Sequence, residues 1–341
     1  MKAVVYRRAT GLVIEDVPIP ELDDEGVLVK VANTGFCGSD HSMIETGILS
    51  EGYILGHETS GIISKVGKNV KGHVPGMRVV IRPTFCGTCR DCRMGKPYFC
   101  GNNRRSIGIG DLPGAFAEYI TVYPQMLIPI PDGVDSQNAA LAEAFAAALH
   151  GIKRSRKEKG SALVIGGGPI GLALVRLLKI IGFGPVVLSE PLEQKRVIAE
   201  SFGVDGVIDP FSEDLGACVF NTTGGIGFET VFECSGVADS IQTAMDAAAR
   251  SGTVCVVSMN FGQINIAPTT LNFKEIWLTG SYSNTHAENI QCLQWMAEGK
   301  VDGRALITDL ITLEELPQVY MERIHTGKAI KVMLQIGDEF Y

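Results

Sequence analysis

The stretch that decides the fold is residues 161–171, which read SALVIGGGPIG. Residues 161–165 form a continuous apolar strand, the glycines form a turn, and an apolar helix follows the turn. Strands that are apolar along their whole length are typical of parallel sheets, because helices cover both faces of such sheets. The segment therefore predicts one strand–turn–helix unit of a doubly wound parallel sheet.

The glycine turn matches the dinucleotide fingerprint G-x-G-x-x-G. Gly166 permits the tight turn, Gly168 lets a pyrophosphate approach the backbone, and Gly171 lets the helix pack against the strand. The free N–H groups of the helix N-terminus favour phosphate. A glycine-rich junction without a ligand is the alternative. The candidate cofactor-binding residues are Gly166, Gly168, Pro169, Ile170, Gly171, Glu190 and Lys195.

Glu190 follows the end of the next predicted strand, over residues 185–189. A carboxylate at this place accepts hydrogen bonds from the adenosine ribose and repels a ribose 2′-phosphate. We therefore expect NAD rather than NADP, although the cations Lys195 and Arg196 lie close behind Glu190 in the chain.

Strands and helices continue to alternate beyond this point, which predicts a Rossmann domain over residues 149–286. Residues 1–148 are instead strand-rich and interrupted by glycine and proline, and only residues 136–152 resemble a helix. The last segment, residues 287–341, is expected to hold two helices and a closing strand. Further strands are predicted at 206–208, 229–233, 252–257, 275–280 and 329–336, and helices at 192–202, 287–299 and 313–326.

A cluster of cysteines with the spacing C-x2-C-x2-C-x7-C is the strongest metal signal. Four thiolates at this spacing can close a tetrahedral site around one Zn²⁺ and organise the loop that carries them. An iron–sulfur cluster is the rival, because it also accepts four cysteines. Unliganded thiols are the remaining alternative. The four residues are Cys86, Cys89, Cys92 and Cys100.

Two shorter motifs, FCGSDH at residues 36–41 and GHE at residues 56–58, supply a thiol, an imidazole and carboxylates. Each is weak evidence alone, because a single buried cysteine or histidine is common in protein cores. Together they suit a zinc site that keeps one position for substrate.

Four features occur in the order and spacing of the zinc-dependent medium-chain dehydrogenase/reductase family. They are CGSD at residues 37–40, GHE at residues 56–58, the four-cysteine cluster, and the glycine turn at residues 166–171 followed by Glu190. The sequence most resembles the branch of sorbitol, threonine and butanediol dehydrogenases, over essentially the whole chain. The resemblance implies an α/β protein with a GroES-like, mainly-β catalytic domain and a Rossmann domain. The catalytic domain would comprise residues 1–148, with residues 287–341 returning to it.

The resemblance also implies two Zn²⁺ ions per subunit, one structural and one catalytic. The catalytic zinc would be held by Cys37 and His57, with Glu58 as a third ligand or exchanging with water during turnover, and with Glu143 bound directly or through water. Asp40 would hold the far nitrogen of His57, Ser39 would begin a proton relay, and His41 would be its relay histidine. The candidate catalytic residues are therefore Ser39, Asp40, His41 and Glu58.

Three departures from the branch stand out. Ala144 follows Glu143 where the branch carries proline, and His41 is immediately adjacent to Asp40. The loop at residues 280–284 lacks the arginine of sorbitol dehydrogenases, which disfavours sorbitol itself.

The implied activity is reversible hydride transfer between NAD and a secondary alcohol or polyol, with zinc as Lewis acid. A zinc-free quinone or enone reductase and a non-catalytic cofactor-binding protein are the alternatives. The resemblance further implies a homo-oligomer, a dimer or a tetramer.

The composition of this 341-residue chain argues against nucleic-acid and membrane partners. Its net charge of −8 gives no basic surplus for nucleic acid. Hydrophobic residues make up 45% of the chain, yet no apolar run is long enough for a membrane span. The first residues lack the apolar core of a signal peptide, so we expect a cytoplasmic protein with a small-molecule alcohol substrate.

Overall fold

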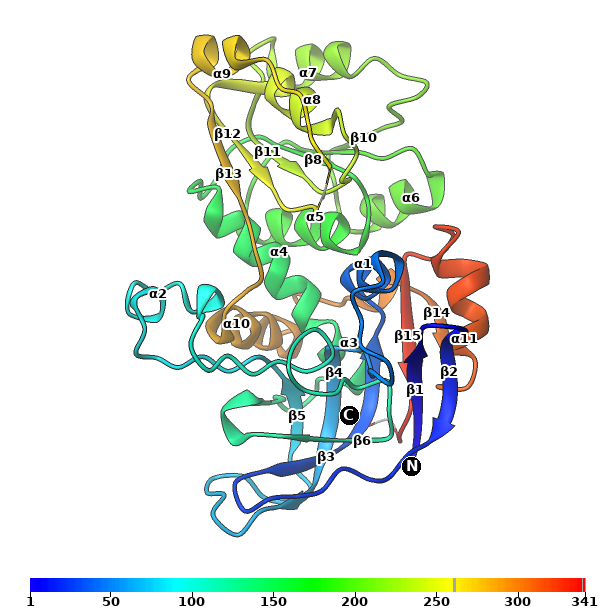
Figure 1. The fold of residues 1–341 in the computed structure, drawn as a ribbon. Helices are drawn as coiled ribbons and strands as arrows, with labels where there is room; N and C mark the ends of the chain where they lie inside the picture. The colour runs from blue at the N-terminus through cyan, green and yellow to red at the C-terminus, as the bar shows by residue number, and fades with distance from the viewer. Residues whose placement is uncertain (260–261, 339, 341) are drawn as a thin grey trace. The chain divides into compact units, whose positions relative to one another are not determined.

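The computed structural model describes residues 1–259, 262–338 and 340. It contains two compact units (Figure 1). The discontinuous unit comprises Met1–Glu143 and Asn289–Tyr341, and the central unit comprises Ala144–Glu288.

The central unit is built on a sheet with the strand order β10-β9-β8-β11-β12-β13, in which all neighbours are parallel. The winding direction reverses between β8 and β11, and ligands bind at such a switch point, beyond the carboxyl ends of the strands. Every residue of β8 is buried, as its unbroken apolar sequence predicts. The strands are β8 Ala162–Ile165, β9 Val186–Ser189, β10 Gly206–Ile208, β11 Phe228–Glu233, β12 Ala248–Val256 and β13 Trp277–Gly280.

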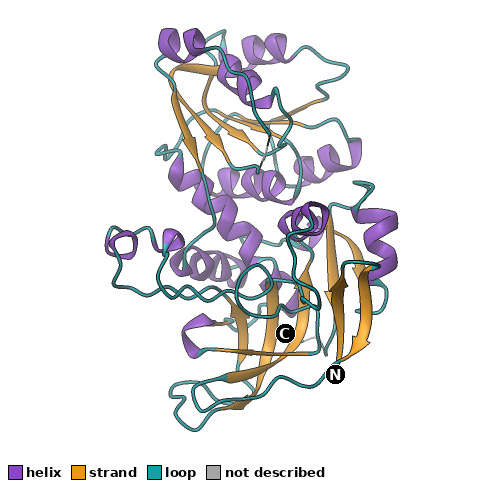
Figure 2. Ribbon diagram, viewed as in Figure 1, coloured by secondary structure: helices purple, strands orange, loops and turns teal. Residues whose placement is uncertain are grey.

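Helices cover both faces of this sheet (Figure 2). Helix α5 packs on β8 and β9 and α6 on β10, whereas α8 packs on β11 and β12. Gly168 precedes α5 as its N-cap, and Pro169 occupies the first turn, where a missing N–H leaves no bond unmade. The helices are α5 Pro169–Ile181, α6 Glu193–Ser201, α7 Leu215–Thr223, α8 Ser240–Ala247 and α9 Pro268–Lys274.

The discontinuous unit has a mainly antiparallel sheet with the order β14-β15-β3-β4-β5-β7, and β6 also pairs with β3. The closing strand β15 lies antiparallel to β3, so the C-terminal segment completes a sheet begun near the N-terminus. A separate ribbon pairs β1 with β2. The strands are β1 Lys2–Arg7, β2 Gly11–Asp16, β3 Val27–Gly35, β4 Glu58–Val66, β5 Arg78–Ile81, β6 Tyr119–Val122, β7 Leu127–Pro129, β14 Ile307–Ile311 and β15 Lys331–Gln335.

The remaining helices lie mostly in this unit, except that α4 starts at Ala142 and continues into the central unit, which begins at Ala144. They are α1 Gly38–Thr46, α2 Arg90–Arg93, α3 Ser136–Ala140, α4 Ala142–Arg154, α10 His286–Ala297 and α11 Leu316–Val319, with a π-helical turn at Tyr320–Ile324 and 3₁₀ turns at Pro97–Phe99, Pro124–Met126 and Arg304–Leu306.

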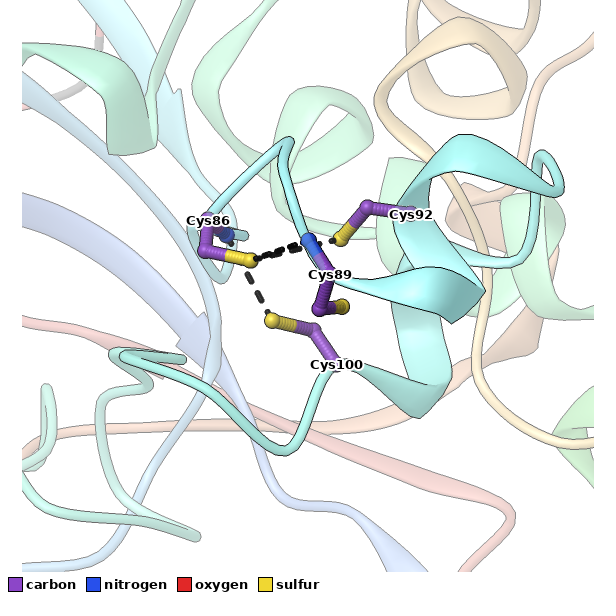
Figure 3. Close-up of side chains that lie close together, drawn as sticks. All are labelled: Cys86, Cys89, Cys92 and Cys100. Carbon is purple, nitrogen blue, oxygen red and sulfur yellow. Dashed lines mark hydrogen bonds between the residues drawn. The ribbon is translucent and has the colours of Figure 1, made fainter.

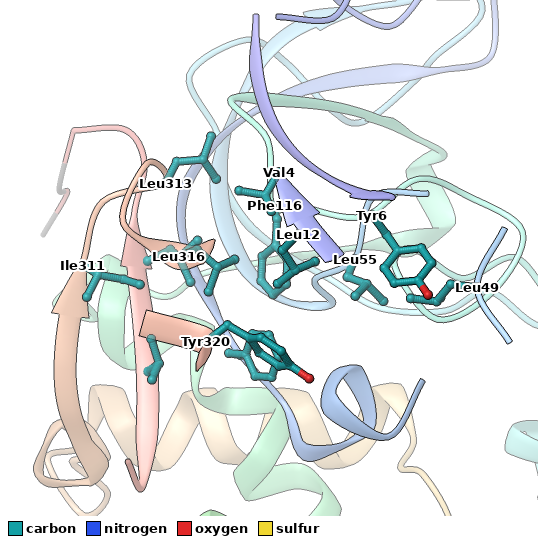
Figure 4. Packing of buried hydrophobic residues seen from close by; sticks show 13 residues of the cluster. Val4, Tyr6, Leu12, Leu49, Leu55, Phe116, Ile311, Leu313, Leu316 and Tyr320 are labelled. Carbon is teal, nitrogen blue, oxygen red and sulfur yellow. The ribbon is translucent and has the colours of Figure 1, made fainter. Parts of the chain in front are cut away.

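One hydrophobic cluster joins the two ends of the chain within the discontinuous unit (Figure 4). It brings Val4 and Tyr6 of β1 together with Leu316 and Tyr320 from the C-terminal segment. The ring of Phe116 is fully buried there and stacks on Phe36, with centroids 5.6 Å apart. Burial of apolar side chains from both ends explains why the C-terminal segment returns to this unit.

The structure confirms the expected two-part α/β fold class, with a mainly-β part and a parallel sheet of Rossmann type. Its elements differ from the sequence predictions in several places. Helix α1 was not expected, because only residues 136–152 of the first segment resembled a helix, and α7, α8 and α9 were not predicted either. The single helix expected over residues 136–152 is divided between α3 and α4 at Leu141, whose N–H bonds to the carbonyl three residues earlier. The helix expected over residues 313–326 is shorter and ends in the π-helical turn. Strand β14 was not predicted, because its alternating burial gives a short and weak pattern.

Within the described residues, no helix combines the length and apolar character needed to cross a bilayer.

Candidate functional site

The cysteine lobe brings all four predicted thiols together (Figure 3). Their sulfur atoms surround a common point and lie within 4.8 Å of one another. The Sγ atoms of Cys86 and Cys92 are 3.9 Å apart, close to the roughly 3.8 Å expected between sulfurs that share a tetrahedral zinc. None of the four forms a disulfide. The donor set and spacing therefore fit one closed zinc site.

Backbone N–H groups in this loop point at the sulfurs. Cys89 N–H donates to Cys86 Sγ at 3.2 Å, and Cys86 N–H donates to Cys100 Sγ at 3.4 Å. Hydrogen bonds from the backbone of Thr88 and Cys89 lower the pKa of Cys86 to about 6. These donors favour the thiolate form of Cys86, which is the form that binds a metal, whereas burial and the neighbouring thiols raise the pKa of Cys92 to about 12.

A second group joins Cys37, His57 and Glu58, whose ligand atoms also lie within 4.8 Å of one another. Cys37 is the N-cap of α1, directly after β3, and Glu58 is the first residue of β4. The β3–β4 pairing sets Gly35 opposite Glu58. A Cβ at Gly35 would lie 2.2 Å from a Glu58 carboxylate oxygen, so only glycine leaves room for this side chain.

Asp40 connects the helix cap to the histidine. Its Oδ2 accepts a hydrogen bond from Cys37 N–H at 2.9 Å, and its Oδ1 lies 3.2 Å from His57 Nδ1. The Oδ1 and Nδ1 atoms are buried but not aligned as a hydrogen bond, so this contact is an ion-pair distance only. Burial lowers the pKa of His57, but Asp40 and the Cys37 thiol raise it more, and the pKa lies well above its ordinary value. Asp40 thus faces Nδ1, and Nε2 remains as the nitrogen for a metal.

The Ser39 hydroxyl lies 3.4 Å from His57 Nε2. His41 has a different partner, because its Nδ1 contacts the Tyr320 hydroxyl at 3.1 Å. The predicted catalytic residues Ser39 and His41 therefore have different partners: Ser39 contacts His57, and His41 contacts Tyr320.

Sequence reasoning missed Lys331. Its ammonium group is 2% exposed and donates to both oxygens of Glu58, at 2.7 and 2.8 Å, and to Phe36 C=O at 3.0 Å. The available signal was a lysine at the start of an otherwise apolar closing strand. Burial lowers the pKa of Lys331, but Glu58 and Cys37 raise it to a net value above the ordinary one. Glu58 is thus a buried carboxylate with a buried cation beside it.

Glu143 lies in the first turn of α4, and one of its oxygens is 3.3 Å from Arg82 Nη1. Arg82 is 5% exposed, and burial lowers its pKa although Glu143 opposes that effect. Among the described residues, the group formed by Cys37, His57 and Glu58 does not include Glu143. Its role as a zinc ligand remains a prediction, and Arg82 is a second cation that sequence reasoning did not find.

The central unit contains a cavity of about 630 Å³ at the carboxyl ends of β8 and β9. Of the predicted cofactor residues, it is lined by Gly166, Gly168, Glu190 and Lys195. Pro169 and Ile170 begin α5 beside it. Gly171 has the packing role that the fingerprint requires, because a Cβ there would lie 1.9 Å from Gly166 C=O. A Cβ at Gly168 would meet nothing within 4 Å, which leaves open space for a ligand.

Glu190 is buried at the edge of this cavity. Its carboxylate accepts hydrogen bonds from Gly167 N–H at 2.6 Å and Leu192 N–H at 2.9 Å. Lys195 Nζ is 4.0 Å away. The Arg196 guanidinium donates to two backbone carbonyls and lies 3.6 Å from Asp209. Arg196 is therefore engaged elsewhere, and Glu190 retains lone pairs for a further donor.

Two family models match the chain. The alcohol dehydrogenase GroES-like domain matches residues 23–132, and the zinc-binding dehydrogenase domain matches residues 169–298. The curated relatives include a 2-dehydro-3-deoxy-L-galactonate 5-dehydrogenase from Pseudoalteromonas atlantica, which is 32% identical over 92% of both chains. A sorbitol dehydrogenase from Halalkalibacterium halodurans is 33% identical over 98% of this chain and 99% of its own.

Solved structures of similar proteins cover nearly the whole chain. A protein from Sinorhizobium meliloti, described as a zinc-binding dehydrogenase bound to NADP, has a TM-score of 0.89 at 31% identity and covers 98% of both chains. The galactitol-1-phosphate dehydrogenase of Escherichia coli has a TM-score of 0.91 at 25% identity, over 98% of this chain and 100% of its own.

We predict that Cys89→Ser removes one zinc ion per chain and lowers the melting temperature, because three thiolates hold the ion poorly and the loop loses its organising centre. Metal analysis and thermal unfolding on the same preparation provide the measurement. Cys218→Ser is the matched control, since Cys218 is half-buried and lies outside the cysteine cluster. Full metal content with an unchanged melting temperature in Cys89→Ser would show that this lobe holds no structural zinc.

We also predict that Lys331→Met destabilises the fold by about 3–5 kcal/mol, because it leaves the Glu58 carboxylate buried without a cation. Adding Glu58→Gln to this variant removes the stranded charge and should recover part of the loss. The free energy of unfolding in urea, measured for the single and double variants, tests both statements. A double variant less stable than Lys331→Met would contradict the importance of the buried charge.

Proposed function

The chain belongs to the zinc-dependent medium-chain dehydrogenase/reductase family, and on this premise we propose that it transfers a hydride reversibly between NAD and a secondary alcohol or polyol. The observation that carries the proposal is the convergence of Cys37, His57 and Glu58 on one point, with their ligand atoms within 4.8 Å of one another. A thiolate, an imidazole and a carboxylate are the donors of a catalytic zinc that keeps a position for substrate.

Zinc bound by these residues would act as a Lewis acid that acidifies the hydroxyl of the substrate. The chain itself supplies the positioning. Asp40, held by the N-terminus of α1, faces Nδ1 of His57 and directs Nε2 to the metal position. Ser39, with its hydroxyl 3.4 Å from Nε2, lies where it can accept a proton from the substrate hydroxyl.

Glu58 has two possible partners in this arrangement, the metal and Lys331. Both Glu58 oxygens accept hydrogen bonds from the Lys331 ammonium group, which balances the charge of the carboxylate. Glu58 would be a third ligand of the zinc or would exchange with water during turnover, as the family resemblance implies. Glu143, which contacts Arg82 through one oxygen, would bind the zinc directly or through water.

We propose NAD as the preferred nicotinamide cofactor. Glu190 lines the cavity at the end of β9 and carries a negative charge where an adenosine ribose would lie. A 2′-phosphate would meet that charge, and Arg196 is turned to carbonyls and Asp209. The relative from Sinorhizobium meliloti is described as bound to NADP. The proposed preference for NAD therefore rests on Glu190 and its neighbours in the present chain, and not on that relative.

We propose two zinc ions per chain, the second held by the cysteine lobe, where it organises the loop and takes no part in the reaction. A homo-oligomer, a dimer or a tetramer, is proposed on the family resemblance alone, and a cytoplasmic location is proposed from the pattern of apolar residues in the sequence.

The proposal is tested with a panel of polyols, amino alcohols and cyclic alcohols, each supplied with NAD⁺ and with NADP⁺. We expect at least one secondary alcohol to give NADH, and we expect Cys37→Ala to lose this activity together with one zinc ion. Enone or quinone reduction by the zinc-free chain, with no alcohol oxidised, would favour the reductase alternative. Cofactor binding without turnover of any class would favour the non-catalytic alternative.

We predict that Glu190→Gln lowers the ratio of NAD to NADP efficiency by at least about tenfold, which corresponds to 1.4 kcal/mol. The glutamine keeps one acceptor oxygen, but its NH₂ group replaces the oxygen that accepts from the second backbone N–H, so the variant removes the charge and one hydrogen bond. Glu193→Gln is the matched control, because Glu193 is an exposed carboxylate three residues further along the chain. Steady-state kinetics with both cofactors decide the point, and an unchanged ratio in Glu190→Gln would refute the assignment of Glu190.

A further inference from the structure

A third group of potential metal ligands lies outside both candidate zinc sites. It consists of His41, Glu45 and His325, and one ligand atom from each lies within 4.8 Å of the others. Among the described residues, the other groups of potential ligands this close together are the two cysteine-containing sites. We propose that these three side chains form an additional binding site for a divalent transition-metal ion such as Zn²⁺.

The local structure holds the three side chains on one side of α1. His41 and Glu45 are four residues apart on this helix, so they share a face. His325 follows the π-helical turn Tyr320–Ile324, and its N–H donates to Tyr320 C=O at 2.8 Å. The site therefore joins two elements that are distant in sequence and adjacent in the fold.

Tyr320 orients the group. Its ring is 5% exposed and packs in the hydrophobic cluster, 5.8 Å from the Phe36 ring between centroids (Figure 4). Its hydroxyl donates to Glu45 Oε1 at 3.0 Å and contacts His41 Nδ1 at 3.1 Å. A hydroxyl has one proton, and here it goes to Glu45, so His41 Nδ1 must be the donor in the second contact. The neutral ring then carries its lone pair on Nε2, the form that binds a metal.

The donor set determines the class of ion. Two imidazole nitrogens and one carboxylate oxygen suit zinc, nickel, cobalt or copper, whereas Mg²⁺ and Ca²⁺ take oxygen ligands. The side chains of Glu45 and His325 are 48% and 47% exposed, which leaves room for water to complete the coordination. His325 Nδ1 lies 3.4 Å from Glu45 Oε1, so the imidazole and the carboxylate already face each other.

An ion here would restrain both elements that supply its ligands. Glu45 lies in the last turn of α1, so an ion would connect that turn to His325, just after the π-helical turn. The first turn of the same helix carries Ser39 and Asp40. The site does not require that the proposed dehydrogenase activity be correct, because none of its ligands belongs to the two candidate zinc sites.

The test begins with protein that carries its full zinc complement, verified by metal analysis. Titration with ZnCl₂ in a calorimeter should reveal one further ion per chain, and the same ion should raise the melting temperature. His325→Ala and, separately, Glu45→Gln should weaken this binding at least about tenfold, the scale of losing a metal-site residue. His73→Ala is the matched control, because His73 lies outside the group and contacts Lys71 C=O.

Several results would overturn the proposal. They are the absence of a further zinc ion, binding that both His325→Ala and Glu45→Gln leave unchanged, and equal binding of MgCl₂. Half an ion per chain with a doubled molecular mass would also overturn it, because the ion would then bridge two copies of the chain. His325→Ala should keep its basal zinc content and any alcohol dehydrogenase activity, which separates this site from the proposed catalytic one.

Discussion

The buried pair between Lys331 and Glu58 is the interaction on which the discontinuous unit depends. Lys331 begins the last strand, Glu58 begins β4, and the same ammonium group holds Phe36 C=O just after β3. A charge buried this deeply is tolerated only with its partner and its hydrogen bonds in place. The pair therefore couples the return of the C-terminal segment to the position of a carboxylate beside Cys37 and His57.

Backbone geometry near this pair explains how weak motifs become a site. The β3–β4 register places Glu58 opposite Gly35, and the end of β3 delivers Cys37 to the N-terminus of α1. There Asp40 accepts the N–H of Cys37 with one oxygen and faces His57 with the other. One buried carboxylate thus stabilises the start of α1 and also faces the ring of a proposed metal ligand.

Each compact unit supplies a different part of the proposed chemistry. The central unit forms the cofactor cavity from its own strand ends, with Gly166, Gly168 and Glu190 around it. The discontinuous unit holds the proposed metal ligands, and two of its carboxylates have buried cations beside them: Lys331 beside Glu58 and Arg82 beside Glu143. These cations decide how readily either carboxylate can approach a metal, because a carboxylate that leaves a buried cation loses both charge balance and hydrogen bonds.

The sequence by itself determined the fold class, the family, the dinucleotide fingerprint and the four-cysteine lobe. These depend on short-range patterns: an apolar strand before a glycine turn, an acidic residue after the next strand, and thiols at fixed spacing. Only the tertiary structure revealed Lys331, Arg82, strand β14 and the group of His41, Glu45 and His325. Their partners lie far away in the chain, as Lys331 and Glu58 do at a separation of 273 residues. Such pairings follow from strand register and from the packing of the two chain ends, and no local pattern of residue types encodes them.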